Sequence, residues 1–322
     1  MLAIKTKKYV KAVIEAPPSK SYTQRALVIA ALASGKSIIK KPLFSDDTSH
    51  MISALKLFGV RIERKGNNLV VYGTNGRLKQ PKGRIFAGNA GTTMRFITAF
   101  ASIAEGASVI TGDKRMQQRP INGLIDALRQ LGVKSESSSG CPPVKVYGGN
   151  FVGGAARLKG SISSQYLSSI LMVAPYAKKN VTINILGNLT SKPYVDITID
   201  VMKSFGVDIK NSNYKKFIIK NSKKYKARAY VIEGDASSAS YFFAAAAVTK
   251  GKIMVKNINP KSKQGDIKFV DILKRMGCGV RKGNSSIEVQ GSSLKGIDVD
   301  MNEMPDIVPT LAVTGLFAGS AT

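Results

Sequence analysis

The residues best suited to chemistry are small, polar and basic, and they lie just before predicted helices. Pro-Pro-Ser-Lys20-Ser21 precedes one helix, with Arg25 four and five residues further on near the same face. Gly-Asn89-Ala-Gly91-Thr92-Thr-Met-Arg enters another. Helix N-termini present backbone N–H groups that attract anions, and small residues let a ligand approach closely. The alternatives are a serine cap with a solvated lysine, and a tight strand-to-helix turn.

Two further loops have the same character. Arg115 and Arg119 lie between Gly112 and Pro120, before a helix. The planar fork of arginine suits phosphate and carboxylate oxygens, although surface pairing with Asp113 would also explain them. Small polar side chains begin two later helices, where they could bind polar oxygens or serve only as helix caps. They are Ser163, Ser164, Gln165 and Ser191.

Few residues suit acid–base or metal chemistry. Asp306 begins an apolar helix in an acid-poor chain, either as a helix cap or as a general base facing a cleft. The single histidine, His50, is interpreted as structural. Cys141 and Cys278 lack the spacing of a zinc site, so we expect no metal.

Composition narrows the class of protein. The chain has 322 residues, 43% of them hydrophobic, and a formal charge of +29. The charge suggests a nucleic-acid partner, but the lysines and arginines are scattered, with one cluster at 223–228, so we expect none. No apolar run reaches the length of a membrane helix. The first eight residues carry lysines with no apolar stretch behind them, so we expect no signal peptide and a cytoplasmic protein.

Internal repetition organises the chain. Four similar segments end amphipathic helices at glycines about 70 residues apart, namely Gly59, Gly132, Gly206 and Gly277. A strand pair is predicted after each glycine. A second set of helices recurs with the same period, at 19–34, 89–105, 163–178, 236–250 and 305–318. The repeating unit is therefore βαβαββ, and the polar loops occupy equivalent places in it. Units packed around a local three-fold would gather these loops at one end, which predicts a ligand with several anionic groups.

The motifs together resemble those of the 5-enolpyruvylshikimate-3-phosphate (EPSP) synthase family. Matching strings run in family order: Pro-Ser-Lys-Ser with Arg25, Gly-Asn-Ala-Gly-Thr-Thr-Met-Arg, Arg-Met-x-x-Arg-Pro-Ile, Ser-Ser-Gln-Tyr, Ser-Lys-Pro-Tyr-Val-Asp, Gly-Asp-Ala-Ser-Ser and Met-Pro-Asp. The resemblance implies an α/β fold, a two-domain inside-out α/β barrel of βαβαββ units. Residues 18–227 would form a three-repeat domain, and residues 1–17 plus 228–322 the second domain.

The resemblance also implies a reaction in aromatic amino acid (chorismate) biosynthesis. The family transfers the enolpyruvyl group of phosphoenolpyruvate to the 5-hydroxyl of shikimate 3-phosphate, releases phosphate and needs no cofactor. Asp306 and Lys20 would be catalytic, with Asp306 accepting the hydroxyl proton. Shikimate 3-phosphate would contact Lys20, Ser21, Arg25, Ser163, Ser164, Gln165, Ser191 and Asp306. Phosphoenolpyruvate would contact Lys20, Asn89, Gly91, Thr92, Arg119 and Gln165.

The sequence also departs from the family. About four and a half repeats fit in the chain, and the family's later motifs would follow Thr322. These are an Arg-x-Lys-Glu-Ser-x-Arg segment, a His-Arg pair and a final lysine. We therefore expect an incomplete last unit, a chain that is a fragment, and no turnover. We also expect a monomer that binds small anionic substrates.

Two alternatives stay open. A UDP-N-acetylglucosamine enolpyruvyl transferase would share the fold but favours a reactive cysteine in the loop at 112–119, where this chain has none. A basic RNA-binding protein built from similar repeats would show strongly salt-dependent binding.

Overall fold

The structure, a computed structural model, describes residues 6–322. Residues 1–5 lie outside the described residues. They belong to the N-terminal segment in which we expect no signal peptide. The chain forms two compact units. The continuous unit is Lys20–Ile232, and the discontinuous unit is Met1–Ser19 with Glu233–Thr322. The sequence analysis divides the chain after residues 17 and 227. The structural boundary follows Ile232 because strand β13 (Ala229–Val231) pairs in parallel with β2 of the continuous unit.

Four successive repeats follow the order βαβαββ. The first comprises β1 (Lys11–Glu15), α1 (Lys20–Leu32), β2 (Ser34–Lys40), α2 (Asp46–Leu57), β3 (Arg61–Lys65) and β4 (Asn68–Thr74). The second comprises β5 (Arg84–Phe86), α3 (Gly91–Phe100), β6 (Gly106–Thr111), the 3₁₀ helix η1 (Met116–Gln118), α4 (Asn122–Gln130), β7 (Lys134–Glu136) and β8 (Val144–Gly148).

The third repeat comprises β9 (Gly154–Lys159), α5 (Ser164–Val173), η2 (Ala174–Tyr176), β10 (Val181–Leu186), α6 (Lys192–Ser204), β11 (Ile209–Ser212) and β12 (Lys216–Ile219). The fourth comprises β13, α7 (Ala236–Val248), β14 (Lys252–Lys256), η3 (Gly265–Lys268), α8 (Phe269–Arg275), β15 (Gly279–Lys282) and β16 (Ser286–Gln290). After it come η4 (Pro305–Ile307) and α9 (Val308–Gly315).

The glycines that define the repeat end helices as predicted. Gly59, Gly132, Gly206 and Gly277 have φ values of 87°, 87°, 90° and 110°. This left-handed conformation is costly for residues with a Cβ, so glycine at these positions lets the chain leave the helix and enter the next strand. The helices predicted as the second set are shorter than their predicted ranges. Helix α5, for example, is predicted over 163–178 but ends at Val173 and gives way to the 3₁₀ turn η2.

Each sheet has four strands, with one parallel and two antiparallel pairs. The orders are β5-β6-β8-β7, β9-β10-β12-β11, β13-β2-β4-β3 and β1-β14-β16-β15. The first and fourth repeats have therefore exchanged their first strands. β1 pairs with β14, Lys11 opposite Lys252, and β13 pairs with β2, Ala229 opposite Ile38.

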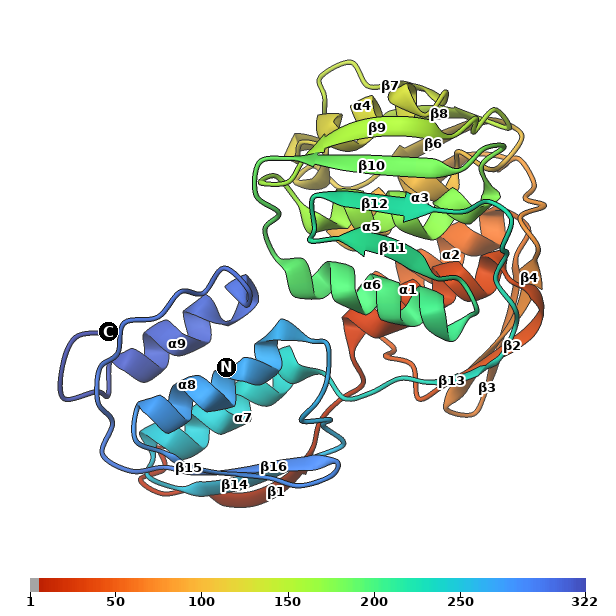
Figure 1. Ribbon diagram of the computed structural model, residues 1–322. Coiled ribbons are helices and arrows are strands. Elements are labelled where there is room, and N and C mark those ends of the chain that lie inside the picture. Colours follow the sequence, from red (N-terminus) through yellow and green to blue (C-terminus); the bar gives the residue numbers. More distant parts are fainter. Residues whose placement is uncertain (1–5) are drawn as a thin grey trace. The chain divides into compact units, whose positions relative to one another are not determined.

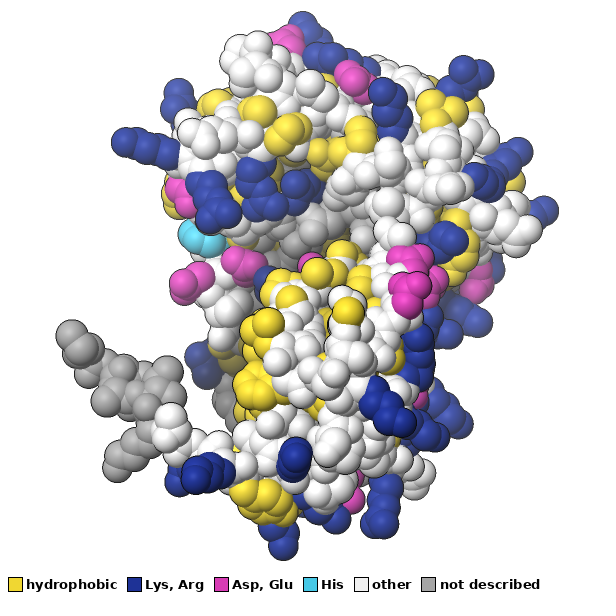
Figure 2. All heavy atoms as spheres, turned by 90° about the vertical axis from the view of Figure 1, so that its left-hand side faces the viewer, with side chains coloured by type: hydrophobic (Ala, Val, Ile, Leu, Met, Phe, Trp, Pro, Cys, Tyr) yellow, Lys and Arg dark blue, Asp and Glu magenta, His cyan; other side chains and the backbone are white. Residues whose placement is uncertain are grey.

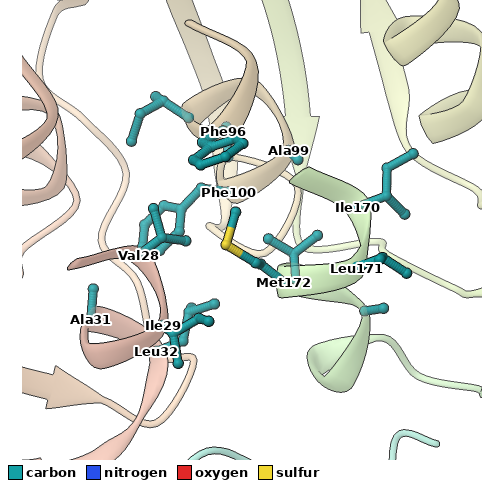
Figure 3. Packing of buried hydrophobic residues seen from close by; sticks show 14 of the residues in the cluster. Val28, Ile29, Ala31, Leu32, Phe96, Ala99, Phe100, Ile170, Leu171 and Met172 are labelled. Atoms are coloured by element: carbon teal, nitrogen blue, oxygen red, sulfur yellow. The ribbon is translucent and has the colours of Figure 1, made fainter. Parts of the chain in front are cut away.

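Three helices form the centre of the continuous unit. Most side chains of α1, α3 and α5 are buried, including polar ones near the start of α1. Val28 and Ile29 of α1, Phe100 of α3 and Met172 of α5 converge in this core (Figure 3). Helices α2, α4 and α6 each pack against two of the central helices, and the sheets lie outside (Figure 1). Helices inside and sheets outside are the arrangement that the resemblance implies.

The discontinuous unit has one sheet, β1-β14-β16-β15, against which α7 and α8 pack. Phe243, Phe269 and Ile287 lie in its separate core. Helix α9 leaves Val313, Leu316 and Phe317 more than half exposed, and hydrophobic side chains gather on this face of the unit (Figure 2). Lysine and arginine side chains are spread over both units in the same view rather than collected in one patch. No helix among residues 6–322 combines the length and apolarity needed to cross a membrane.

Candidate active site

The start of α1 presents the first group of predicted site residues. Lys20 Nζ lies 3.2 Å from Asp47 Oδ2 of α2, and both side chains are partly exposed. One turn further, Arg25 is 1% exposed. Its Nε donates to Thr198 Oγ1 at 2.7 Å, and its terminal nitrogens donate to the carbonyls of Ser21 (3.0 Å) and Tyr194 (3.1 Å).

Arg25 is a buried cation held by neutral acceptors. Its guanidinium lies over the Phe96 ring, 5.2 Å from the centroid, and none of its hydrogen bonds goes to a carboxylate. Burial lowers the pKa of Arg25 to about 10, partly offset by the Tyr194 and Tyr22 hydroxyl groups. The group still carries its charge at neutral pH. A buried charge without a counterion is costly, so the arrangement suits an anion that would complete it.

The start of α3 approaches two further arginines. Ala90 caps the helix without a side-chain hydrogen bond, and Gly91 begins it. A Cβ on Gly91 would lie 2.6 Å from a terminal nitrogen of Arg95 and 2.9 Å from both terminal nitrogens of Arg119. A Cβ at this position would displace the ends of both side chains, so glycine lets the two guanidinium groups lie close to the backbone. Asn89 and Thr92 flank this position along the chain.

The second arginine connects α3 to α5. Arg95 donates to Gln165 Oε1 at 2.7 Å, and its guanidinium lies 5.6 Å from the Tyr166 ring centroid. Burial lowers the pKa of Arg95, and the charge of Arg119 lowers it further. Two like charges held together in a partly buried place favour an anionic ligand between or beside them.

The serines differ in what they do. Ser163 caps α5, since its Oγ accepts from the Gln165 backbone at 3.2 Å. Ser164 is buried, with 5% exposed. Ser191 precedes α6 in the left-handed conformation, with φ 53° and ψ 44°, and makes no side-chain cap. A serine held in this strained geometry, with its hydroxyl not used as a cap, fits a functional position better than a structural one.

The structure thus brings the starts of α1, α3 and α5 together at one end of the continuous unit. Arg25 of α1 contacts Phe96 of α3, and Arg95 of α3 contacts Gln165 of α5. The predicted gathering of helix starts is confirmed within this unit. Arg115 is not part of the cluster and is exposed. Asp113 does not pair with it, because its Oδ1 accepts from the Met116 backbone at 2.8 Å.

The ring of His50 packs edge-on against Phe86 at 5.7 Å, and a Cβ on Gly88 would lie 2.3 Å from its Nε2. Within residues 6–322, no three histidine, cysteine, aspartate or glutamate side chains are grouped so that they could hold a metal ion.

Asp306 lies in the discontinuous unit, on η4. The residue that caps η4 is Met304, and Asp306 follows it in the first turn, so the helix-cap interpretation of Asp306 is wrong. Its charge acts on the buried carboxyl of Asp266 on η3, as does the charge of Asp235 at the start of α7.

The sequence analysis did not single out three residues that the structure places among the candidates. Arg95 could have been found, because it lies four residues after Gly91 and so returns to the same helix face. Asp47 and Thr198 reach Lys20 and Arg25 only through tertiary contacts. The sequence carries no local signal for either.

The buried central helices and the surrounding sheets define the inside-out α/β fold of the enolpyruvyl transferases, and the basic helix starts are suited to anionic ligands. A profile described as EPSP synthase (3-phosphoshikimate 1-carboxyvinyltransferase) matches residues 4–322. The chain is 44% identical to the 3-phosphoshikimate 1-carboxyvinyltransferase of Sulfurovum sp. (strain NBC37-1) over 328 residues, which is 100% of this chain and 77% of that protein. The protein of the same name from Buchnera aphidicola subsp. Schizaphis graminum is 46% identical over 324 residues, covering 98% and 75%.

Structural comparison agrees. An EPSP synthase structure from Acinetobacter baumannii matches with a TM-score of 0.80 at 25% sequence identity, covering 96% of this chain and 71% of that one. The chain belongs to the EPSP synthase family.

Proposed function

We propose that the protein transfers the enolpyruvyl group of phosphoenolpyruvate to the 5-hydroxyl of shikimate 3-phosphate and releases phosphate, in aromatic amino acid biosynthesis. Family membership supports the reaction. The observation that carries the proposal to this chain is Arg25, a fully buried cation whose three hydrogen bonds all go to neutral oxygens. A ligand with a phosphate or carboxylate group supplies the missing negative charge.

Shikimate 3-phosphate is proposed to bind across the starts of α1, α5 and α6. Its anionic and hydroxyl groups would take hydrogen bonds from Lys20, Ser21, Arg25, Ser163, Ser164, Gln165 and Ser191. The uncapped, left-handed Ser191 supports this assignment, since its hydroxyl is not used by its own helix.

Phosphoenolpyruvate is proposed to bind at the start of α3. Gly91 leaves room beside Arg119, and Asn89, Thr92, Lys20 and Gln165 are the other proposed contacts. The backbone N–H groups at the first turn of α3 carry no side-chain cap, which suits an anion. Fixed cations of this kind stabilise an intermediate that is richer in negative charge than either substrate.

Asp306 is proposed as the base. In the addition step its carboxylate takes the proton of the 5-hydroxyl while the hydroxyl oxygen bonds to C2 of phosphoenolpyruvate and C3 receives a proton. In the elimination step the C2–O bond to phosphate breaks, a proton leaves C3 and the enol ether forms. Lys20 is the other proposed catalytic group. The protein is proposed to act in the cytoplasm on these small anions.

Two measurements test the proposal. Calorimetric titration with shikimate 3-phosphate should give saturable binding to the wild-type chain, with at least about tenfold weaker binding of shikimate, which lacks the phosphate. Arg25→Met should lose this binding. Arg61→Met is its control for the loss of an arginine, because Arg61 is exposed and pairs with Glu63 at the surface. Saturable binding of UDP-N-acetylglucosamine without binding of shikimate 3-phosphate would instead support the alternative transferase, and salt-dependent RNA binding alone would support the RNA-binding protein.

Phosphate release from the two substrates together tests turnover. Release that depends on both substrates would establish the reaction. Saturable binding of shikimate 3-phosphate without release would contradict the proposed turnover and leave only the assignment of the binding site in place.

A further inference from the structure

The sheet of the third repeat, β9-β10-β12-β11, has an outer face with no role in the proposal above. Its inward side chains, such as Leu158 and Phe217, are buried in the core of the continuous unit. Successive side chains of a strand point to opposite faces, so the residues between these point outward. Four exposed cations point outward, and we call them the basic face: Arg157 and Lys159 on β9, Lys210 on β11 and Lys216 on β12.

The strand register spreads these cations over the whole width of the sheet. Arg157 lies opposite Asn184 of β10, which in turn lies opposite Lys216. Lys210 lies opposite Ile218, two residues along β12 from Lys216. Because neighbouring strands are about 4.8 Å apart, the four strands place the cations over a width of about 14 Å. One phosphate or carboxylate group cannot span this width, whereas a chain of anionic groups can.

The other three sheets carry an acid on the equivalent face. The fourth residue after the repeat glycine is Glu63 in the first repeat and Glu136 in the second, but Lys210 in the third. Glu63 and Glu136 each form an ion pair on their own sheet. The fourth repeat has Arg281 at this position, and Glu288 lies opposite it and pairs with two cations. Three of the four repeats therefore balance the charge of this face internally.

The third repeat has no such balance. Its strands β9, β10, β11 and β12 contain no aspartate or glutamate. Asp208 precedes β11, and its Oδ2 lies 4.0 Å from Lys223 Nζ. Among the residues that the structure describes, no carboxylate lies within 4.0 Å of a charged nitrogen of the basic face. Like charges on neighbouring strands repel, so the stability of the sheet does not explain this arrangement.

The other outward side chains suit a polypeptide better than a nucleic acid. Phe217 is the one aromatic residue of the four strands and is buried, so bases would find no ring to stack on. Leu186, opposite Lys159, is 47% exposed, and Ile218 is partly exposed. Apolar groups between cations can contact the side chains of a protein partner.

The backbone edge of β9 is already occupied. Gln130 of α4 accepts from the backbone N–H of Arg157 at 2.8 Å and donates to its carbonyl at 3.2 Å. A partner that pairs with the exposed edge of a sheet needs these backbone groups. Docking at this sheet therefore uses the outward side chains rather than an added strand beside Arg157.

We propose that the basic face binds an acidic segment of a partner protein. The carboxylates of the segment supply the ion pairs that the other three sheets form internally. None of the four cations belongs to the candidate active site, so the inference stands independently of the proposed enzymatic function.

The test is the fluorescence anisotropy of a labelled peptide of about ten glutamates, titrated with the whole chain near physiological ionic strength. Lys210→Glu together with Lys216→Glu should weaken binding at least about tenfold, because two attractive charges become repulsive. The matched control is Lys36→Glu together with Lys65→Glu. It changes the net charge equally at exposed positions of the sheet β13-β2-β4-β3, and it should weaken binding less than about twofold.

Equal losses in the two double variants would assign binding to the overall charge of +29 and overturn the proposal. Absence of saturable binding by the wild type would overturn it as well. If the first double variant does not fold, Lys210→Gln together with Lys216→Gln decides instead. This pair removes the two charges without reversing them and should weaken binding a few-fold, whereas unchanged binding would again contradict the proposal.

A labelled single-stranded RNA of the same charge as the peptide tests the choice of partner. The peptide should bind at least as tightly as the RNA at this ionic strength, because the face offers bases no aromatic platform. Tighter binding of the RNA, weakened by Lys210→Glu with Lys216→Glu and not by the control pair, would make the face a nucleic-acid surface and overturn the assignment of an acidic protein segment.

Discussion

Arg25→Met is expected to leave the stability of the fold nearly unchanged while removing shikimate 3-phosphate binding. Methionine is close to arginine in length and has no charge, and it can fill the buried space beside Phe96. Both effects follow from the same structural fact, which is that Arg25 is buried among neutral groups.

The magnitude comes from the shift of the Arg25 pKa. Burial lowers this pKa from 12.5 to about 10, so holding the charge inside the protein costs about 3 kcal/mol relative to the unfolded chain at any pH well below 10. Removing Arg25 also loses three hydrogen bonds, at about 1 kcal/mol each after exchange with water, and a contact with Phe96 worth about 0.5–1 kcal/mol, so about 3–4 kcal/mol in total. The Tyr194 carbonyl keeps the hydrogen bond from Thr198 Oγ1 at 3.0 Å. The gain and the loss nearly cancel, so the stability of Arg25→Met should lie within about 1 kcal/mol of the wild type, and its Tm within a few degrees.

Thermal and urea unfolding at pH 7, with and without shikimate 3-phosphate, measure both effects. The wild type should gain stability from the ligand and Arg25→Met should not, with affinity reduced by about a hundredfold or more. Arg61→Met should change stability by less than about 1 kcal/mol and leave the ligand effect intact, since its ion pair with Glu63 lies at the surface. Loss of more than about 2 kcal/mol in Arg25→Met would refute the reasoning and make Arg25 a structural residue.

Three further outcomes are expected. Gly91→Ala should weaken phosphoenolpyruvate binding at least about tenfold, measured by fluorescence or calorimetry, because its Cβ would displace the guanidinium groups of Arg95 and Arg119; a change in stability of more than about 1 kcal/mol would show that the helix itself is disturbed. Asp47→Asn should change stability by less than about 1 kcal/mol and raise shikimate 3-phosphate affinity a few-fold, since the ligand no longer competes for Lys20; weaker binding would contradict this. The third outcome concerns pH. Burial raises the pKa of Asp266 from 3.8 to about 6, so the stability that its protonated form contributes is fully present below about pH 4 and is lost as the pH rises to about 6. Asp266→Asn should therefore gain up to about 3 kcal/mol in free energy of unfolding on the wild type across this interval, measured by chemical denaturation. Parallel pH profiles of the two proteins would contradict this prediction.

Much of the architecture could be read from the sequence because each repeat carries local signals. The glycines Gly59, Gly132, Gly206 and Gly277 mark helix ends through a backbone conformation that only glycine adopts at low cost, and the structure confirms them. The exchange of β1 and β13 could not be derived from local pattern. A strand's alternation shows which face is buried but not which partner lies at its edge, and β1 and β14 are far apart in the chain.

The candidate site shows the same division. Lys20, Gly91 and Ser163 were found because capping and anion binding are properties of a helix start. Two of the three acceptors of Arg25 lie on Thr198 and Tyr194, 173 and 169 residues away in sequence, so its burial without a counterion is visible only in the fold. Asp266 was overlooked because a short polar stretch predicts a surface loop, whereas here it is covered by the start of α7.

The strand exchange has a consequence for synthesis on the ribosome. β1 is synthesised early, but its partner β14 ends only at Lys256. At about 5–20 residues per second, roughly 10–50 s therefore pass between the synthesis of β1 and that of the strand with which it pairs. Over nearly the same interval β2 lacks β13 along one edge. Exposed strand edges are where nascent chains pair with the wrong partner, and lysines at such edges discourage it. Three lysines lie on these unpaired strands, Lys11 in β1 and Lys36 and Lys40 in β2. Their charges would discourage pairing with neighbouring chains until the fourth repeat has been synthesised.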